Sequence, residues 1–364
     1  MARLETRLCG VELKSPFVLG SGPLSYSGEA LVRASNAGAG AVVTKTIRLK
    51  PADNPFPHMV ANGNNSLINC EKWADLSAEQ WIQKEIPFAK KHGAVVVGSV
   101  GHTPEEAIAL VADVARAGAD LIELVSYREE DMVPMVAEAR KRVEVPILAK
   151  LSPNGSRVVE TAGDCLKAGA NGITAIDSYG PVLRIDIATA RPLLGNVDGF
   201  GWLSGAAIKP IALRYVAEIA RDYRAEIVGL GGVVKAEDAL EMLMAGASAV
   251  GVCSAAVLRG PGLFAELVRG LDALMEKYGY ASVGEVSGKA LPNLWPEEQF
   301  EELVFYFDPA KCNECMQCVK LCPYQARTLA DKQMGLDESE CRRCGFCVSV
   351  CKRGALTSNK LGLI

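Results

Sequence analysis

The feature that most constrains this chain is the placement of its cysteines. Twelve are present in 364 residues, and eight of them fall in two runs that repeat the spacing C-x2-C-x2-C-x3-C. The first run is Cys312, Cys315, Cys318 and Cys322, and the second is Cys341, Cys344, Cys347 and Cys351. The other four cysteines are scattered through the long N-terminal part. The repeated spacing therefore predicts two similar binding sites with thiol ligands in the C-terminal segment.

Thiolates at this spacing are typical of bacterial ferredoxins that hold two [4Fe–4S] clusters. Three cysteines of a run wrap around one cluster, and the fourth reaches the other cluster. We therefore predict that Cys351 joins Cys312, Cys315 and Cys318, and that Cys322 joins Cys341, Cys344 and Cys347. Structural zinc sites are the alternative, but zinc ligands are usually spaced as two separated pairs. Arg342, Arg343 and Lys352 lie near the second run, where they either tune a cluster or attract an acidic partner, or form solvated surface.

Charge and hydropathy exclude several classes of protein. The net charge is −4, with no basic block for nucleic acid, and no apolar run approaches the ~18–20 residues of a membrane helix. The N-terminal residues lack the apolar core of a signal peptide, and disulfide frameworks normally accompany secretion. We therefore expect a protein of the reducing cytoplasm that contacts neither nucleic acid nor membrane.

Residues 1–278 alternate short apolar runs with helical patterns, which predicts a βα repeat. Eight strands are expected: 17–19, 41–44, 95–100, 121–125, 147–151, 173–176, 227–230 and 249–252. Helices are expected at 104–117, 158–168, 208–223, 236–245 and 263–278. The phrase Ala-Gly-Ala precedes strands at Gly38, Gly118, Gly169 and Gly246, where glycine suits a helix exit.

Eight βα units predict an α/β protein with a closed (β/α)8 TIM barrel. Residues 4–14 are expected to form a hairpin that plugs the barrel bottom. An open doubly wound sheet is the alternative, but no G-x-G-x-x-G follows the first strand. We expect a linker at 279–308 and a ferredoxin-type α+β domain at 309–364.

The strand ends of such a barrel carry the chemistry, and phosphate binds after strands seven and eight. Strand seven ends in Gly231-Gly232, and strand eight ends in Cys253-Ser254 before a helix. Both can offer backbone N–H groups to an anion. Lys45 and Lys150 end two other strands, and an inward lysine is costly unless it faces an anion such as a reduced flavin. A structural salt bridge is the alternative for each lysine.

The sequence resembles the dihydroorotate and dihydropyrimidine dehydrogenase family, above all the FMN-barrel and ferredoxin half of dihydropyrimidine dehydrogenase. The motifs that carry the resemblance are 19–22, 44–46, 66–69, 149–154, 169–175, 203–213, 231–232 and 253–254. The resemblance implies that FMN contacts Gly20, Ser21, Lys45, Thr46, Lys150, Thr174, Ser204, Gly205, Gly231, Gly232, Cys253 and Ser254. It also implies that Asn69 contacts a substrate.

The chain departs from the family where the family places its acid/base cysteine, after strand four. That segment reads Val125-Ser126-Tyr127-Arg128-Glu129-Glu130-Asp131, without cysteine and with the family's asparagine replaced by Val125. After strand six, the family's Asn-Thr is Asp177-Ser178. A site built for amide hydrogen bonds strongly rejects a mismatched ligand, which lowers the expectation of pyrimidine turnover. Tyr127, Glu129, Asp131 and Asp177 are the replacement candidates, although acidic residues here also suit a helix N-terminus.

Two functions follow from these observations. The first is an FMN and iron–sulfur oxidoreductase that acts on a CH–CH or C–N bond of a small, cyclic or acyclic molecule. The second is a non-catalytic electron-transfer subunit in which FMN joins two-electron and one-electron carriers. Because the chain has no dinucleotide fingerprint, we expect a separate partner subunit of the flavin/NAD(P)H or ferredoxin type. The resemblance implies a homodimer or hetero-oligomer.

Overall fold

The computed structural model describes residues 4–63, 65–294 and 302–360. The chain forms two compact units, Met1–Leu294 and Trp295–Ile364, which are treated separately below.

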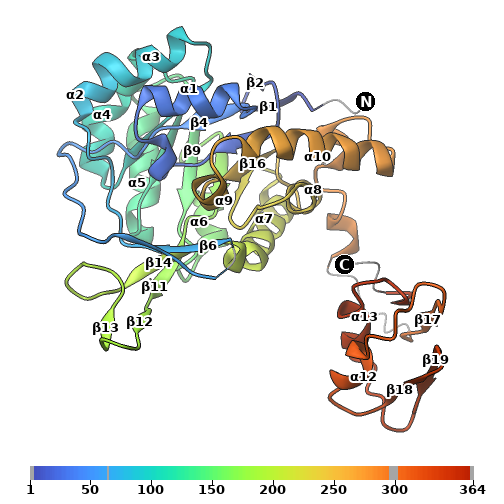
Figure 1. Ribbon diagram of the computed structural model, residues 1–364. Helices are drawn as coiled ribbons and strands as arrows, with labels where there is room; N and C mark the ends of the chain where they lie inside the picture. The colour runs from blue at the N-terminus through green and yellow to red at the C-terminus, as the bar shows by residue number, and fades with distance from the viewer. Residues whose placement is uncertain (1–3, 64, 295–301, 361–364) are drawn as a thin grey trace. The chain divides into compact units, whose positions relative to one another are not determined.

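The first unit is a closed barrel of eight parallel strands, which confirms the predicted fold and excludes the open sheet. Figure 1 shows these strands inside a ring of helices. The strands are β3 (Phe17–Leu19), β4 (Ala41–Val43), β7 (Val96–Gly101), β8 (Leu121–Val125), β9 (Ile147–Leu151), β10 (Gly172–Ala175), β15 (Glu226–Leu230) and β16 (Ala249–Val252). All eight predicted strands are present, and β16 pairs with β3 to close the barrel.

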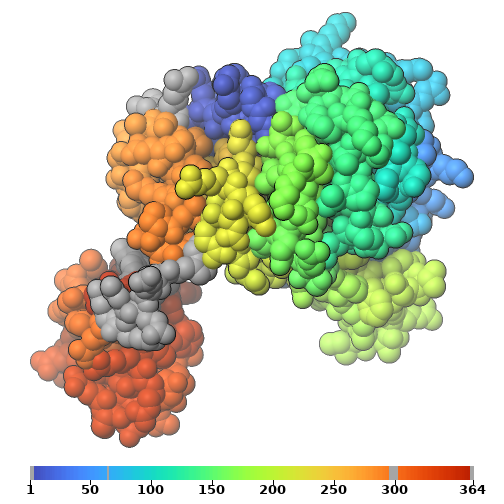
Figure 2. All heavy atoms as spheres, turned by 180° about the vertical axis from the view of Figure 1, so that it is seen from behind, coloured from blue at the N-terminus to red at the C-terminus, as the bar shows by residue number. Residues whose placement is uncertain are grey.

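The helices surround the barrel in chain order, as the colour bands of Figure 2 show from behind. They are α1 (Gly28–Asn36), α2 (Ala78–Gln80), a π turn (Trp81–Glu85), α3 (Ile86–Lys91), α4 (Pro104–Arg116), α5 (Glu129–Arg140), α6 (Val158–Lys167), α7 (Lys209–Tyr223), α8 (Ala236–Met244), α9 (Ser254–Arg259) and α10 (Leu263–Tyr278). The four predicted glycine exits all have positive φ, from 111° to 120°. This backbone region favours glycine, so the repeated Ala-Gly-Ala phrase has a local steric cause.

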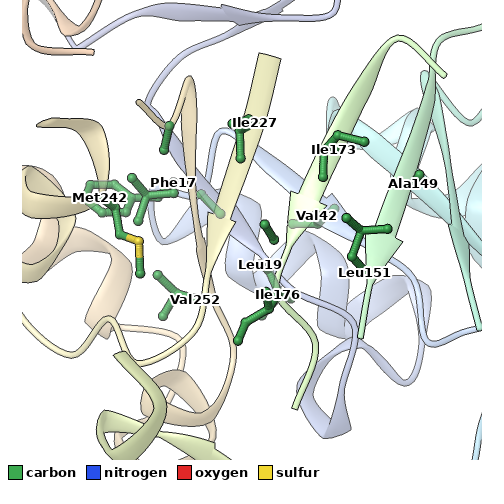
Figure 3. Close-up of a cluster of buried hydrophobic side chains, with 14 of the residues drawn as sticks. Phe17, Leu19, Val42, Ala149, Leu151, Ile173, Ile176, Ile227, Met242 and Val252 are labelled. Carbon is green, nitrogen blue, oxygen red and sulfur yellow. The ribbon is translucent and has the colours of Figure 1, made fainter. Parts of the chain in front are cut away.

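The strands bury both faces. Outward side chains such as Phe17, Ile173 and Ile227 pack against the helices, with Met242 of α8 reaching toward the strands (Figure 3). Inward side chains at the amino ends form a second apolar cluster. Leu8 and Leu13 of the hairpin β1 (Thr6–Leu8) and β2 (Val11–Leu13) belong to that cluster. The hairpin therefore closes the barrel bottom, as predicted.

A four-stranded antiparallel sheet, which was not predicted, lies in the loops that follow β4 and β10. It contains β5 (Met59–Ala61), β6 (Ser66–Asn69), β11 (Tyr179–Val182) and β14 (Gly201–Gly205), in the order β11-β14-β6-β5. A small extension, β12 (Ile185–Asp186) with β13 (Arg191–Pro192), projects beyond it (Figure 1). Residues 59–61 and 66–69, for which no element was predicted, are thus strands.

The expected linker begins later than residue 279. Helix α11 (Val283–Val286) buries Val283 and Val286 in the barrel's core cluster, and a 3-10 turn follows at Leu291–Asn293. Residues 295–301 of the expected linker lie outside the described residues. Among the described residues, no helix has both the length and the apolar composition to cross a membrane.

The second unit repeats one small motif twice, which confirms the ferredoxin-type domain. In each copy a short helix carries the third cysteine of a run: α12 (Gln317–Lys320) carries Cys318, and α13 (Phe346–Ser349) carries Cys347. Two antiparallel strand pairs accompany these helices. They are β17 (Phe305–Phe307) with β20 (Leu356–Ser358), and β18 (Arg327–Ala330) with β19 (Gln333–Leu336).

Candidate functional site

One cavity opens at the carboxyl ends of the barrel strands, under the additional sheet. Its empty space is about 930 Å³ when solvent at the mouth is included. Most of the residues predicted to bind a cofactor line it: Ser21, Lys45, Thr46, Lys150, Ser204, Gly205, Gly231, Gly232, Cys253 and Ser254. Asn69, Tyr127 and Asp177, predicted to meet a substrate, line it as well. The fold therefore brings segments far apart in sequence to one space.

Two lysines form buried ion pairs in this cavity. Lys45 Nζ lies 2.6 Å from Glu71 Oε2, and Lys150 Nζ lies 3.3 Å from Asp177 Oδ1. Burial alone would lower the pKa of Lys150, but the carboxylates of Asp177 and Glu123 outweigh it and raise that pKa. Lys150 therefore stays charged. The structure shows the alternative, a salt bridge for each lysine, and a flavin facing the two lysines stays a prediction.

A layer of polar side chains lies inside the barrel directly above the apolar one. Glu123 of β8 is buried, and its Oε2 accepts a hydrogen bond of 2.9 Å from Thr174 Oγ1. Hydroxyl contacts continue from Glu123 toward the cavity through Ser99 (3.5 Å), then Thr46 (3.0 Å) and Ser21 (3.2 Å). Burial raises the pKa of Glu123 even though Lys150 opposes the shift. This layer forms the polar floor of the site.

Backbone groups dominate the opposite side of the cavity. Gly231 and Gly232 have φ of 132° and 80°, and a Cβ on Gly232 would lie 2.7 Å from the backbone nitrogen of Lys209. Glycine is therefore required there, and its N–H groups are not covered by a side chain. Ser254 begins α9 and donates 2.8 Å to Ser204 Oγ. N–H groups, two hydroxyls and a helix start in one place suit a phosphate group.

Aromatic rings cover the cavity on the side of the additional sheet. Tyr127 stacks between Trp202, at 4.5 Å between ring centroids and 2° between planes, and Trp73, at 5.1 Å and 29°. His102 packs against the far side of Trp73 at 5.2 Å. Burial raises the pKa of Tyr127, and the Asp177 carboxylate raises it further. Tyr127 is therefore a neutral hydrogen-bond donor held in a fixed plane.

Four predicted site residues do not line this cavity, namely Gly20, Glu129, Asp131 and Thr174. The Asp131 carboxylate pairs with Arg128 at 3.3 Å. Glu129 does not line the cavity, because its carboxylate accepts hydrogen bonds from the backbone of Ser156 and Arg157 and from the Thr161 hydroxyl. The alternative for this acidic stretch is confirmed, because Glu129, Glu130 and Asp131 lie in the first turn of α5. Glu129 also accepts hydrogen bonds at the start of α6, and a catalytic role for it stays a prediction that its place outside the cavity does not support. Thr174 is buried beneath the cavity against Glu123, and Gly20 packs beside Leu230 and Cys253.

Sequence reasoning missed four residues of the site, namely Glu71, Trp73, Glu123 and Trp202. Glu71 and Trp73 follow the end of β6 and line the cavity beside Asn69, its last residue. Glu123 interrupts an apolar strand, Leu-Ile-Glu-Leu-Val, that is otherwise buried on both faces. That interruption was visible in the sequence. Trp202 pairs with Asn69 across β14 and β6, which only the fold reveals.

In the second unit the cysteines come together across the two runs. The electrostatic neighbours of Cys318 include Cys315 and Cys351, and those of Cys347 include Cys344 and Cys322. All twelve cysteines of the chain are free of disulfides. Backbone N–H groups also point at ligand sulfurs, with Glu314 N 3.4 Å from Cys312 Sγ and Arg343 N 3.4 Å from Cys341 Sγ. The donor set thus fits two 4Fe-4S clusters, and the crosswise sharing of ligands stays a prediction, because Cys347 lies near Cys318 as well.

Comparisons with known proteins agree with this geometry. The family model described as dihydroorotate dehydrogenase matches residues 3–275, and the one described as a 4Fe-4S dicluster domain matches residues 305–352. A Methanothermobacter thermautotrophicus protein named dihydroorotate dehydrogenase B (NAD(+)), catalytic subunit, is 37% identical over 304 residues, covering 79% of this chain and 98% of that protein. A Pyrococcus abyssi protein of the same name is 35% identical over 301 residues, covering 79% and 99%.

These matches confirm the resemblance that the sequence motifs carried. The relatives are covered almost completely by about four-fifths of this chain. The chain is therefore an oxidoreductase of the dihydroorotate dehydrogenase family that joins a family barrel to a C-terminal 4Fe-4S dicluster domain.

Proposed function

We propose that this chain moves hydride between FMN and a small substrate, and passes single electrons through two [4Fe–4S] clusters to or from a partner protein. The observation that carries the proposal is the cavity. Glycine and serine residues at one end of it suit a phosphate group, and two buried lysines lie at its floor. Bound there, FMN supplies the exchange between two-electron and one-electron chemistry.

The phosphate of the cofactor is proposed to bind the backbone of Gly231 and Gly232, with Ser204 and Ser254. Lys45 and Lys150 are proposed to hold negative charge at the ring system. Because Glu71 and Asp177 already neutralise these lysines, negative charge arriving at the ring competes with two carboxylates. Ser21 and Thr46 supply hydroxyl donors, and both belong to the series of hydroxyl contacts that leads to Glu123.

The substrate is proposed to bind between the ring system and the aromatic stack, beside Asn69. An oxidation would need a base on this side, and a reduction would need a proton donor. Tyr127 keeps its proton because burial raises its pKa, so it suits donation better than abstraction. Asp177, beside Lys150 in the cavity, is the carboxylate positioned to act as a base.

A second function is favoured by one observation: Tyr127 is stacked between two tryptophans where the family keeps a cysteine on a long loop. An aromatic wall in that position suits a flavin that exchanges electrons only with proteins. The chain would then be a non-catalytic electron-transfer subunit of a larger complex. Asn69 and the size of the cavity favour the enzyme.

Anaerobic reoxidation separates the two functions. The oxygen-free chain is photoreduced and then offered pyrimidines, hydantoins and enoates, and flavin absorbance is followed. Reoxidation by one of these compounds supports an enzyme, whereas reoxidation only by a co-purified subunit supports the electron-transfer role.

Tyr127→Phe is the matched variant, because it keeps the stack and removes the hydroxyl. For an enzyme that uses Tyr127 as proton donor, the variant keeps its flavin and loses substrate-driven reoxidation. Unchanged substrate rates in Tyr127→Phe would remove Tyr127 from the proposed chemistry.

A further inference from the structure

A buried arginine lies beside the predicted cluster ligands in the C-terminal unit. Arg327 begins β18 and is only 5% exposed. Its guanidinium carbon lies 4.2 Å from the ring centroid of Phe305, and its side chain lines the same hollow as Cys341, a predicted cluster ligand. Its Nη2 is buried and has no hydrogen-bond partner among the described residues. A buried cation with a free donor needs negative charge nearby.

The internal repeat of the small unit shows that this arginine is present in one half only. Arg327 is the fifth residue after Cys322, and the fifth residue after Cys351 is Leu356. Both follow a buried alanine, and Leu356 is itself buried at 2% exposure. The Leu356 backbone N–H lies 3.4 Å from Cys351 Sγ, and Arg327 lines one hollow with Cys341, so the position is near a predicted ligand in each half. The two cysteine sets therefore differ by one buried charge.

No carboxylate lies within salt-bridge distance of Arg327 in the described part of the unit. Two acidic residues line the same hollow: Glu302 pairs with Arg343 instead, and Glu338 is exposed to solvent. Arg342, Arg343 and Lys352 are exposed, so water and salt screen them. Arg327 is in a medium of lower dielectric, where a charge acts over a longer range.

The geometry points to Arg327 as the residue that makes the two clusters unequal. The cluster held by Cys322, Cys341, Cys344 and Cys347 would accept an electron before the cluster held by Cys312, Cys315, Cys318 and Cys351. Reduction adds one electron, hence one negative charge, to a cluster without making or breaking a bond. A buried cation beside the ligands stabilises that reduced form, as net charge near the cluster does in iron–sulfur sites generally. The inference rests on the proposed ligation of both clusters.

The test is a potentiometric titration of the full chain, oxygen-free, with reduced clusters followed by EPR. The wild type is expected to show two separate one-electron steps. Arg327→Leu, which copies the other half of the repeat, should lower the higher step and leave the lower one in place. We expect at least a tenfold loss in the equilibrium constant for reducing that cluster, which is about 59 mV for one electron.

The reciprocal change provides an independent check. Leu356→Arg should raise the lower step and bring the two steps together. Arg327→Gln, which keeps an N–H donor but removes the charge, should fall between wild type and Arg327→Leu. Arg327→Lys keeps the charge and should stay nearest the wild type. If Arg327→Leu loses iron, Leu356→Arg and Arg327→Gln still decide the question.

The outcomes are distinguishable from failure of the ligation itself. If no reduced-cluster signal forms in the wild type, the eight-cysteine ligation is contradicted. If both clusters form with wild-type iron content and neither Arg327→Leu nor Arg327→Gln moves the higher step, the role of Arg327 is overturned. Two coincident steps in the wild type would overturn it as well.

Discussion

Each of the two units of this chain is stabilised by a different kind of interaction. The barrel buries a continuous apolar core that includes Trp81, Phe17 and Phe264 at 0% exposure. Among residues 302–360, the small unit has one apolar cluster of four buried residues, and two of them are the cysteines Cys318 and Cys347. A core of that size cannot offset the entropy of ordering the chain. The barrel is therefore stabilised by burial of apolar side chains, whereas the small unit depends on what its cysteines bind.

Removal of iron should give the largest effect and should separate the two units. Under chelation we expect the small unit to lose its protection against hydrogen exchange completely, because metal binding supplies its folding energy. The barrel should keep its protection. Hydrogen exchange measured by mass spectrometry on the full chain reports both units at once. A small unit that stays protected without iron would contradict its dependence on bound metal.

Within the barrel, Lys150→Met should give the next largest effect. It leaves Glu123 and Asp177 buried without their cation, which costs about 3 kcal/mol of stability. It also removes a charge from the proposed flavin site, so flavin affinity should fall at least tenfold. Flavin content and thermal unfolding are the measurements, and Lys235→Met, which alters an exposed lysine, is the control. Unchanged flavin affinity in Lys150→Met would count against the assignment of this lysine.

Glu129→Ala should act on stability alone. Three donors at the start of α6 lose their acceptor, with an expected loss of about 2 kcal/mol. Flavin content and spectra should match the wild type. Glu130→Ala, at a more exposed position on the same helix, is the control. Should Glu129→Ala keep its stability and lose turnover, the residue would return to the list of catalytic candidates.

The smallest effect is expected from Glu123→Gln, and it depends on pH. Burial raises the pKa of Glu123 above its ordinary value of 4.5, so the folded chain keeps a proton that the unfolded chain has released. The associated stability is fully present below pH 4.5 and is lost as pH rises through the raised folded value. Glutamine does not titrate, so the variant's stability should decline less over that window. Parallel pH profiles of unfolding would contradict a raised pKa.

Much of the fold was predictable because its signals are local. The βα periodicity gave all eight strands, and the positive φ of Gly38, Gly118, Gly169 and Gly246 explains the phrase that marked the helix exits. The cysteine spacing likewise predicted the small unit. The additional sheet escaped prediction, because strands such as Met59–Ala61 gain their order from pairing with segments that are distant in sequence.

The site was predictable where a residue type was costly in its place, as with Lys45 and Lys150. It was not predictable where tertiary partners decide the role. The Glu129 carboxylate looked like a proton donor until α6 was seen to begin beside it. The stack of Trp73, Tyr127 and Trp202 joins two loops and strand β14, which are distant in sequence, and no local pattern relates them.

The most direct test of the central claim is an anaerobic reductive titration of the purified chain, with flavin and iron quantified in the same sample. We predict bound FMN, iron and sulfide for two clusters, and an electron uptake equal to that of a flavin plus two clusters. A colourless protein without flavin or iron after oxygen-free preparation would contradict the account.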